Sequence, residues 1–344
     1  MKPAGRRAHV AVMLLVLLAG CGGKHEEAAG RTAPGAARKF RVGVVFDVGG
    51  KGDRSFNDSA YEGLRRAAAR LPIEVSDFEP GADVDREVGL RKLASRGYDL
   101  VIGIGFLFTD AIRTVAKDHP EVHFALVDGR IEDLPNVASL VFREQEGSFL
   151  VGALAALTSK TGTVGFVGGM DVPLIHKFEA GYRAGVAHVR PATKVLVGYA
   201  GVRPEAFSDP VRGKEIALSQ IAQGADVVFH ASGVTGLGVI EAAKERGVYA
   251  IGVDSNQDGV APGTVLTSMI KRVDVAVERA IEEGYAGRFR SGIVEFGLAD
   301  EGVGFSVDEN NRALLSAGLL ARAAGLRDSI VAGGIVVPAE TGRR

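Results

Sequence analysis

From Phe40 onward, the chain alternates short apolar stretches with segments whose apolar residues recur every three or four positions. The stretch RVGVVF (41–46) opens the series, and the segment 57–71 follows it with the spacing of a half-buried helix. Such alternation predicts parallel sheets whose two faces are both covered by helices. We therefore expect strands at 41–46, 73–78, 100–104, 123–127 and 136–142, and helices near 57–71, 83–96, 109–117 and 147–159.

The alternation then restarts, with strands expected at 162–168, 194–200, 226–231 and 248–254 and helices near 176–189, 211–223 and 236–246. Two such series predict an α/β chain with two doubly wound lobes. The last part is less regular, with a strand at 264–270, a helix near 273–283 and a strand at 291–298. We expect crossings between the lobes near Arg143, Ile270 and Arg290. Residues 40–143 plus about 271–289 then form the first lobe, and residues 144–270 plus about 290–344 form the second.

The N-terminus carries a different pattern. Basic residues precede nine apolar residues, VAVMLLVLL (10–18), which is about half the length that a membrane-spanning helix needs. The following LAGC (18–21) is typical of a bacterial lipoprotein signal, which predicts a signal peptide over 1–20 and lipidation of Cys21. The small and polar residues that follow predict a flexible tether over 21–39. The alternative is that Cys21 merely ends a buried helix.

Composition narrows the class of protein further. The 344 residues are 46% hydrophobic and 24% charged, which suits a chain with a large globular core. A net charge of −1 gives no electrostatic argument for a nucleic-acid partner. Cys21 is the single cysteine, so a disulfide framework within the chain is excluded and a lipid anchor is favoured.

Ligands of open parallel sheets bind beyond the carboxyl ends of the strands, so residues at the strand ends are candidates for a site. With two lobes, these ends would line one cleft between them. The candidates are Asp47, Gly105, Asp128, Gly168, Gly201 with the loop to Asp209, Ser232, Gly233 and Asp254.

The loop FDVGGKGDRSFND (46–58) is the richest of these strand ends in polar residues. It matches neither the P-loop nor the dinucleotide fingerprint, because Val45 and Ser55 stand where those motifs require glycine. Its aspartates do not have the spacing of a calcium loop. The chain also lacks a G-x-S-x-G nucleophile motif. We therefore predict no metal, no cofactor and no catalytic residue, and we interpret Glu144 and Glu146 as the solvated start of a helix.

The remaining interpretation of the loop is that it grips a flat, polar, uncharged ligand. Asp47 offers a hydrogen-bond acceptor, and Asn57 offers both a donor and an acceptor. Phe56 lies between them in a polar loop, where it either faces a ligand or belongs to the core.

Several segments in collinear order resemble the basic membrane protein family, whose members are substrate-binding lipoproteins of ABC transporters similar to purine nucleoside receptor A. The segments are FDVGGKGDRSFND, EGSFLVGALAA, GTVGFVGGMDVPLIHKFEAGYRAG, AFSDP, AIGVDSNQ and TSMIKRVD, within roughly residues 40 to 300. The resemblance implies a type I periplasmic-binding-protein fold, in which two α/β lobes joined by three crossovers close around a ligand.

The resemblance also implies roles for individual residues. Phe56 and Phe207 would sandwich a nucleobase, and Asp47 and Asn57 would hydrogen-bond to its edge. Asp254 would accept hydrogen bonds from two ribose hydroxyls, Lys271 would donate to the ribose, Gly233 would allow close approach of the sugar, and Asp128 is a further ribose candidate. The alternatives are that Phe207 fills the hinge, that Asp254 and Lys271 form a structural ion pair, and that Asp128 caps a turn. Asn256 departs from the family, which commonly has aspartate there.

The resulting prediction is a lipid-anchored extracytoplasmic protein that captures nucleosides, purines in particular, and delivers them to the permease of an ABC importer without acting as an enzyme. One alternative is the same fold binding another small polar ligand, such as a sugar or a thiamine-like heterocycle. A nucleoside-cleaving enzyme and a surface adhesin or sensor are the others.

Overall fold

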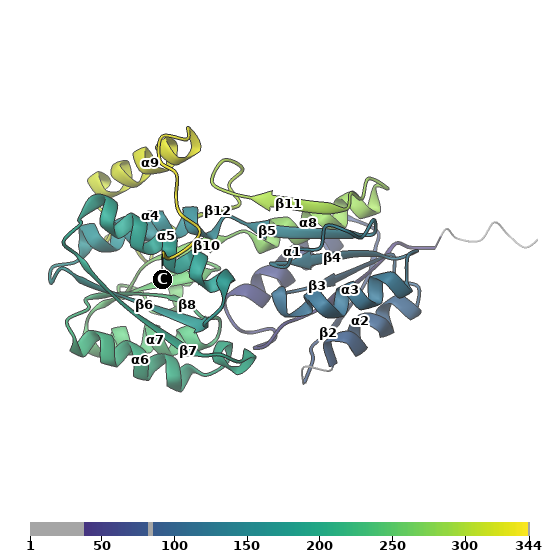
Figure 1. Ribbon diagram of the computed structural model, residues 1–344, viewed down its shortest axis with the longest axis horizontal. Coiled ribbons are helices and arrows are strands. Elements are labelled where there is room, and N and C mark those ends of the chain that lie inside the picture. Colours follow the sequence, from purple (N-terminus) through teal and green to yellow (C-terminus); the bar gives the residue numbers. More distant parts are fainter. Residues whose placement is uncertain (1–37, 82–84, 343–344) are drawn as a thin grey trace, which may run out of the picture. The chain divides into compact units, whose positions relative to one another are not determined.

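The structure is a computed structural model that describes residues 38–81 and 85–342. The predicted signal peptide, the lipidation site at Cys21, nearly all of the predicted tether and the predicted helix start at residue 83 lie outside these residues. The described part contains two six-stranded sheets with helices on both faces of each (Figure 1). None of its helices has both the length and the apolar character that crossing a membrane would require.

The first sheet has the strand order β11-β5-β4-β3-β1-β2, and all of its strands are parallel. Buried strand residues alternate between two cores, one shared with α1 and α8 and the other with α2 and α3. The strands are β1 (Arg41–Val45), β2 (Glu74–Phe78), β3 (Leu100–Gly103), β4 (His123–Val127), β5 (Val137–Phe142) and β11 (Gly292–Phe296). The helices are α1 (Phe56–Arg70), α2 (Asp85–Ser95), α3 (Thr109–Asp118) and α8 (Val273–Tyr285).

The second sheet has the order β12-β10-β9-β8-β6-β7, and β12 is antiparallel to β10. Helices α4 and α5 pack on one face, and α6 and α7 pack on the other. The strands are β6 (Thr163–Met170), β7 (Lys194–Gly201), β8 (Val227–Ala231), β9 (Tyr249–Asp254), β10 (Val265–Lys271) and β12 (Val303–Phe305). The helices are α4 (Glu144–Thr158), α5 (Pro173–Val189), α6 (Pro210–Ala222) and α7 (Thr235–Arg246).

The predicted α/β fold with two doubly wound lobes is confirmed. The chain leaves the first sheet after β5, near Arg143, and returns to it after β10, between Lys271 and Val273. The expected third crossing near Arg290 is wrong, because β11 pairs with β5 over its whole length and thereby extends the first sheet. The crossing comes instead after Phe296, on the way to β12.

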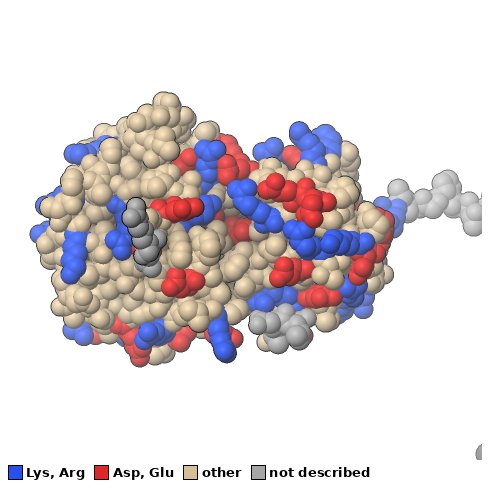
Figure 2. Space-filling view, viewed as in Figure 1, with Lys and Arg blue, Asp and Glu red and all other residues tan. Residues whose placement is uncertain are grey.

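The sequence did not predict two elements of the C-terminal part. The short strand β12 is held by its pairing with β10, and helix α9 (Ala317–Val331) packs against α4. On the face shown in Figure 2, basic and acidic side chains are intermixed over both lobes.

Candidate ligand-binding site

A pocket with about 570 Å³ of empty space, part of it open to solvent, is lined by residues of both lobes. Its walls come mainly from the carboxyl ends of β1, β3, β4, β8, β9 and β10 and from the first turns of α1 and α5. The structure places all eight residues of the predicted binding set along this pocket: Asp47, Phe56, Asn57, Asp128, Phe207, Gly233, Asp254 and Lys271.

The loop before α1 is organised by Asp53. Its carboxylate accepts hydrogen bonds from the backbone N–H groups of Ser55 (2.8 Å), Asn57 (2.8 Å) and Asp58 (3.1 Å). A carboxylate at this position satisfies the free N–H groups of the first helical turn and interacts favourably with the helix dipole. Asp53 therefore fixes the start of α1, where Phe56 enters the pocket.

Asn57 is held by the loop itself. Its Oδ1 accepts from the backbone N–H of Asp47 at 3.0 Å, and its Nδ2 donates to Asp53 Oδ2 at 3.0 Å and to the carbonyl oxygen of Val48 at 3.3 Å. The side chain is buried, with 1% of its surface exposed. The side-chain oxygen and nitrogen expected to read a base edge thus both have partners within the loop.

Asp47 lies beyond the end of β1. Burial raises the pKa of its carboxyl group to about 6, against the lowering effects of the Val48 N–H and of Arg86, whose nitrogen lies 3.4 Å away. Gly105, at the end of β3, makes room for this carboxylate: a Cβ atom there would lie 2.1 Å from Asp47 Oδ2, and the backbone φ is +111°. The sequence named both residues as strand-end candidates, and the fold brings them into contact.

A buried ionic cluster surrounds Lys271, which is 1% exposed. Its Nζ lies 2.6 Å from Asp128 Oδ2 and 3.1 Å from Glu144 Oε1. Burial alone would lower the lysine pKa, but the charges of Asp128, Glu144 and Asp254 outweigh burial and raise it. The lysine is therefore held in its charged form.

Glu144 corrects the expectation of a solvated helix start. It is 1% exposed, and it bridges Lys271 and Lys177. Burial opposes its ionisation, but the two lysines prevail and lower the pKa of its carboxyl group. The local sequence identified the start of a helix, but it carried no sign that this start lies between two cations from other elements.

Asp254 is the last residue of β9, and Asp128 directly follows β4. Both have the same unusual backbone, with φ values of 62° and 67°. Burial raises the pKa of Asp254 to about 7, although Lys271 and the Ser55 hydroxyl favour the charged form. Burial likewise raises the pKa of Asp128, against the opposing charge of Lys271. Within the described residues, the buried Oδ1 of Asp128 has no hydrogen-bond partner. These groups can accept hydrogen bonds from a hydroxylated ligand.

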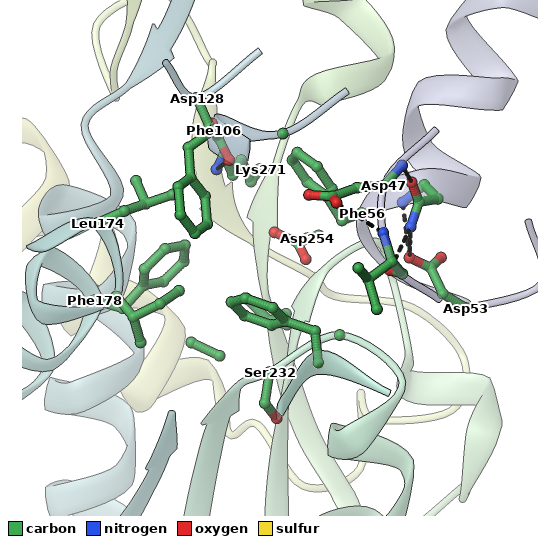
Figure 3. Close-up of a pocket in the computed structure, with 18 residues that line it drawn as sticks. Asp47, Asp53, Phe56, Phe106, Asp128, Leu174, Phe178, Ser232, Asp254 and Lys271 are labelled. Carbon is green, nitrogen blue, oxygen red and sulfur yellow. Dashed lines mark hydrogen bonds and ion pairs between the residues drawn. The ribbon is translucent and has the colours of Figure 1, made fainter. Parts of the chain in front are cut away.

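Apolar side chains, four of them phenylalanines, form most of the rest of the wall (Figure 3). Phe56 and Phe207 come from opposite lobes, and the ring of Phe106 meets that of Phe207 edge-on at a centroid distance of 6.4 Å. In Figure 3, Phe106, Leu174 and Phe178 lie across the pocket from Phe56, with Asp254 between them. Gly233, with φ +57°, allows close approach of the Phe207 backbone, because a Cβ there would lie 3.1 Å from the Phe207 carbonyl oxygen.

The sequence did not single out Phe106, Leu174 or Phe178 as lining residues. Phe106 directly follows the strand-end candidate Gly105, so the strand-end rule could have found it. Leu174 and Phe178 are four residues apart in the first turns of α5 and therefore share a helix face. In the described part of the chain, no three His, Cys, Asp or Glu side chains are grouped so that they could hold a metal ion.

Two α/β lobes joined by three crossings, with a pocket between the strand ends, are typical of the ABC transporter substrate-binding proteins. Residues 40–341 match the family model Bmp, described as the PnrA-like ABC transporter substrate-binding proteins, and the chain belongs to this family. Proteins of this class bind a solute for transport and are not enzymes.

Relatives and solved structures agree with this assignment. The chain is 39% identical to a CD4+ T-cell-stimulating antigen of Listeria monocytogenes over 94% of each chain. It is 33% identical to the ABC transporter nucleoside-binding protein BmpA of Lactococcus lactis, over 96% of this chain and 97% of that protein. An ABC transporter solute-binding protein of Aeropyrum pernix K1 is similar in structure, with a TM-score of 0.78 and 35% identity over 87% of this chain and 94% of that chain.

Proposed function

We propose that the protein captures nucleosides, purine nucleosides in particular, and delivers them to an ABC importer. The observation that carries this proposal is the arrangement of the pocket. Rings from both lobes, Phe56 and Phe207, line the same space as the buried side chains of Asp128, Asp254 and Lys271. A nucleoside has a flat base and a sugar with adjacent hydroxyl groups, so it uses both halves of such a site.

The base would lie against Phe56 and Phe207, since stacking of a base on an aromatic ring contributes about 1–3 kcal/mol. Asp47 would accept a hydrogen bond from a ring N–H or an amino group, while Asn57 would hold the loop that presents Asp47. The name of the Lactococcus relative, which describes a nucleoside-binding protein, supports this choice of ligand.

The sugar would bind at the other end of the site. Asp254 and the free oxygen of Asp128 would accept hydrogen bonds from ribose hydroxyls, and Lys271 would donate one. Gly233 would bring its backbone near the sugar, while its lack of a side chain leaves room for Phe207. Hinge closure at the three crossings would enclose the ligand, as in other two-lobed binding proteins.

We further propose that the protein is anchored outside the cytoplasmic membrane by lipidation of Cys21. The LAGC pattern after nine apolar residues supports this proposal, and membership of an ABC substrate-binding family agrees with it. Metabolic labelling with a fatty-acid analogue would test it: the wild-type protein should be labelled, and the Cys21→Ala variant should not.

A thermal-shift panel followed by calorimetry tests the ligand class, because a ligand that binds the folded state raises its apparent stability. Purine nucleosides should raise the melting temperature, whereas ribose, hexoses and thiamine should not. A response to sugars or to thiamine without a response to nucleosides would refute the proposal. Release of free base from inosine by stoichiometric protein, lost in Asp47→Ala, would instead indicate a nucleoside-cleaving enzyme.

A further inference from the structure

Ser55 stands immediately before α1, at the position where a serine hydroxyl commonly accepts a hydrogen bond from the first turn of a helix. Here the hydroxyl makes no such bond, and Asp53 accepts from the helix N–H groups instead. The serine is completely buried. Its hydroxyl is therefore available for another role.

That hydroxyl reaches across to the second lobe. Ser55 Oγ lies 2.7 Å from Asp254 Oδ2 and 3.3 Å from the carbonyl oxygen of Val253. A hydroxyl has one proton, and the shorter contact to a carboxylate is the stronger hydrogen bond. Each carboxylate oxygen can accept about two hydrogen bonds, so Asp254 keeps Oδ1 and part of Oδ2 for a ligand.

Two more hydrogen bonds join the same segments. Ser255 Oγ donates to the backbone oxygen of Ser55 at 2.7 Å, and Gln257 Nε2 donates to that of Arg54 at 3.1 Å. We call Arg54, Ser55, Asp254, Ser255 and Gln257 the latch. It ties the loop that carries Phe56 to the turn that carries Asp254.

Buried neighbours fix the orientation of the latch. Gln257 Oε1 accepts from the backbone N–H of Val253 at 2.9 Å and lies 2.9 Å from His230 Nε2. Because its oxygen is held on that side, its Nε2 faces Arg54. Burial lowers the pKa of His230 to about 4, so the ring is neutral near pH 7 and adds no charge beside the latch.

We infer that Ser55 is a positioning residue for ligand binding, which orients the Asp254 carboxylate toward the sugar and couples it to the aromatic side of the pocket. This inference rests on the proposed nucleoside function. A neutral donor suits the position, because Asp254 already faces charges from several elements. On the pocket side these charges belong to Lys271, Asp128 and Asp53. On the outer side Asp254 lines a groove together with Asp58, Glu62, Arg272 and Asp274.

The test is calorimetry at pH 8 with a purine nucleoside and its free base, on wild type and Ser55→Ala. Loss of a hydrogen bond to a charged group should weaken nucleoside binding about tenfold or more. The free base should lose less than about threefold, because it does not use Asp254. Ser59→Ala is the matched control: its hydroxyl lies one turn later on α1 and accepts from the backbone N–H of Asp274. It should leave both affinities unchanged.

A double-mutant comparison separates positioning from a merely structural role. In an Asp254→Ala background, Ser55→Ala should cause almost no further loss of nucleoside affinity. The residual affinity of these variants is followed by thermal shift at millimolar nucleoside. The pH at which nucleoside binding is half lost should also rise in Ser55→Ala, because the hydroxyl favours the ionised carboxylate. The inference would be overturned if Ser55→Ala weakened the binding of base and nucleoside equally. It would also be overturned if Ser55→Ala weakened nucleoside binding as much in the Asp254→Ala background as in wild type.

Two further outcomes distinguish a failure of this inference from a failure of the proposed function. If Ser55→Ala does not fold, Ser255→Ala replaces it. This variant should weaken the nucleoside selectively and only while Asp254 is present, and a uniform loss would refute the latch. A wild-type protein that binds no nucleoside refutes the proposed function, whereas a wild type that binds with the wrong variant pattern refutes only the inference.

Discussion

Replacing Asp254 by asparagine should stabilise the unliganded protein at neutral and alkaline pH while impairing nucleoside binding. The carboxyl pKa is about 7 in the folded chain, against a reference value of 3.8. The folded state therefore holds a proton over a pH range in which the unfolded state has lost it. Stability contributed by this group is fully present below about pH 4 and is lost as the pH rises through 7.

The size of the effect follows from the pKa difference of about 3 units. At about 1.36 kcal/mol per unit, ionised Asp254 destabilises the folded state by up to about 4 kcal/mol above pH 7. Asparagine has nearly the same shape and no charge, and it tolerates the left-handed backbone at this position, where φ is 62°. The exchange therefore isolates the charge from changes in packing and backbone.

Urea unfolding of wild type and Asp254→Asn between pH 4 and pH 8 measures this effect. The two proteins should be almost equally stable near pH 4. The free energy of unfolding of the variant should then exceed that of wild type by a margin that grows steadily until about pH 7. Asp110→Asn, which removes an exposed carboxylate on α3, controls for the loss of one negative charge. A difference that does not change with pH, or a wild type that is the more stable protein at pH 8, would refute the reasoning.

Three other substitutions test separate parts of the site. Glu144→Gln should lower the free energy of unfolding by about 3–5 kcal/mol, because it removes a buried charge from between two lysines; a loss below about 1 kcal/mol in urea unfolding would show that the cluster is not stabilising. Phe207→Ala should weaken base and nucleoside alike by about 1–3 kcal/mol in calorimetry, and unchanged affinity for the base would contradict a stacking role. Asn256→Asp should reduce stability by less than about 1 kcal/mol, because Asn256 Nδ2 donates at 2.9 Å to Oδ2 of Asp308 at an exposed site. Nucleoside affinity should stay within about twofold, and a fivefold change would give this position a role in binding.

The strand ends show how far sequence reasoning reaches. Apolar runs alternating with helical segments require parallel sheets, and parallel strands place their carboxyl ends at one edge. The strand ends therefore predict one candidate site that includes Asp47, Gly105, Asp128 and Asp254, and all four line the pocket. The family resemblance singled out Phe207 within the candidate loop from Gly201 to Asp209, and it added Lys271, which no local pattern distinguishes from a core residue.

The polar partners of the site could not be predicted in the same way. Glu144 has the appearance of a solvated helix start, Asn57 that of a free amide, and Ser55 that of an ordinary helix cap. Each is buried and hydrogen-bonded or ion-paired: Glu144 contacts two lysines, Asn57 bonds within its own loop, and Ser55 bonds to the opposite lobe. The partners of Glu144 and Ser55 lie far away in the chain, up to 199 positions, so no local spacing encodes them. Those of Asn57 lie only 4 to 10 positions away, and they depend on how the loop folds back on itself.

The sequence by itself determined three things: the two lobes, the family, and the edge of each sheet at which the site lies. It could do so because periodicity, strand direction and motif order are local or collinear properties of the chain. Only the tertiary structure decided that β11 belongs to the first sheet, that Glu144 completes a charge cluster with Lys271, and that Ser55 holds Asp254 rather than its own helix. The physical reason is that burial and charge pairing depend on which distant elements meet.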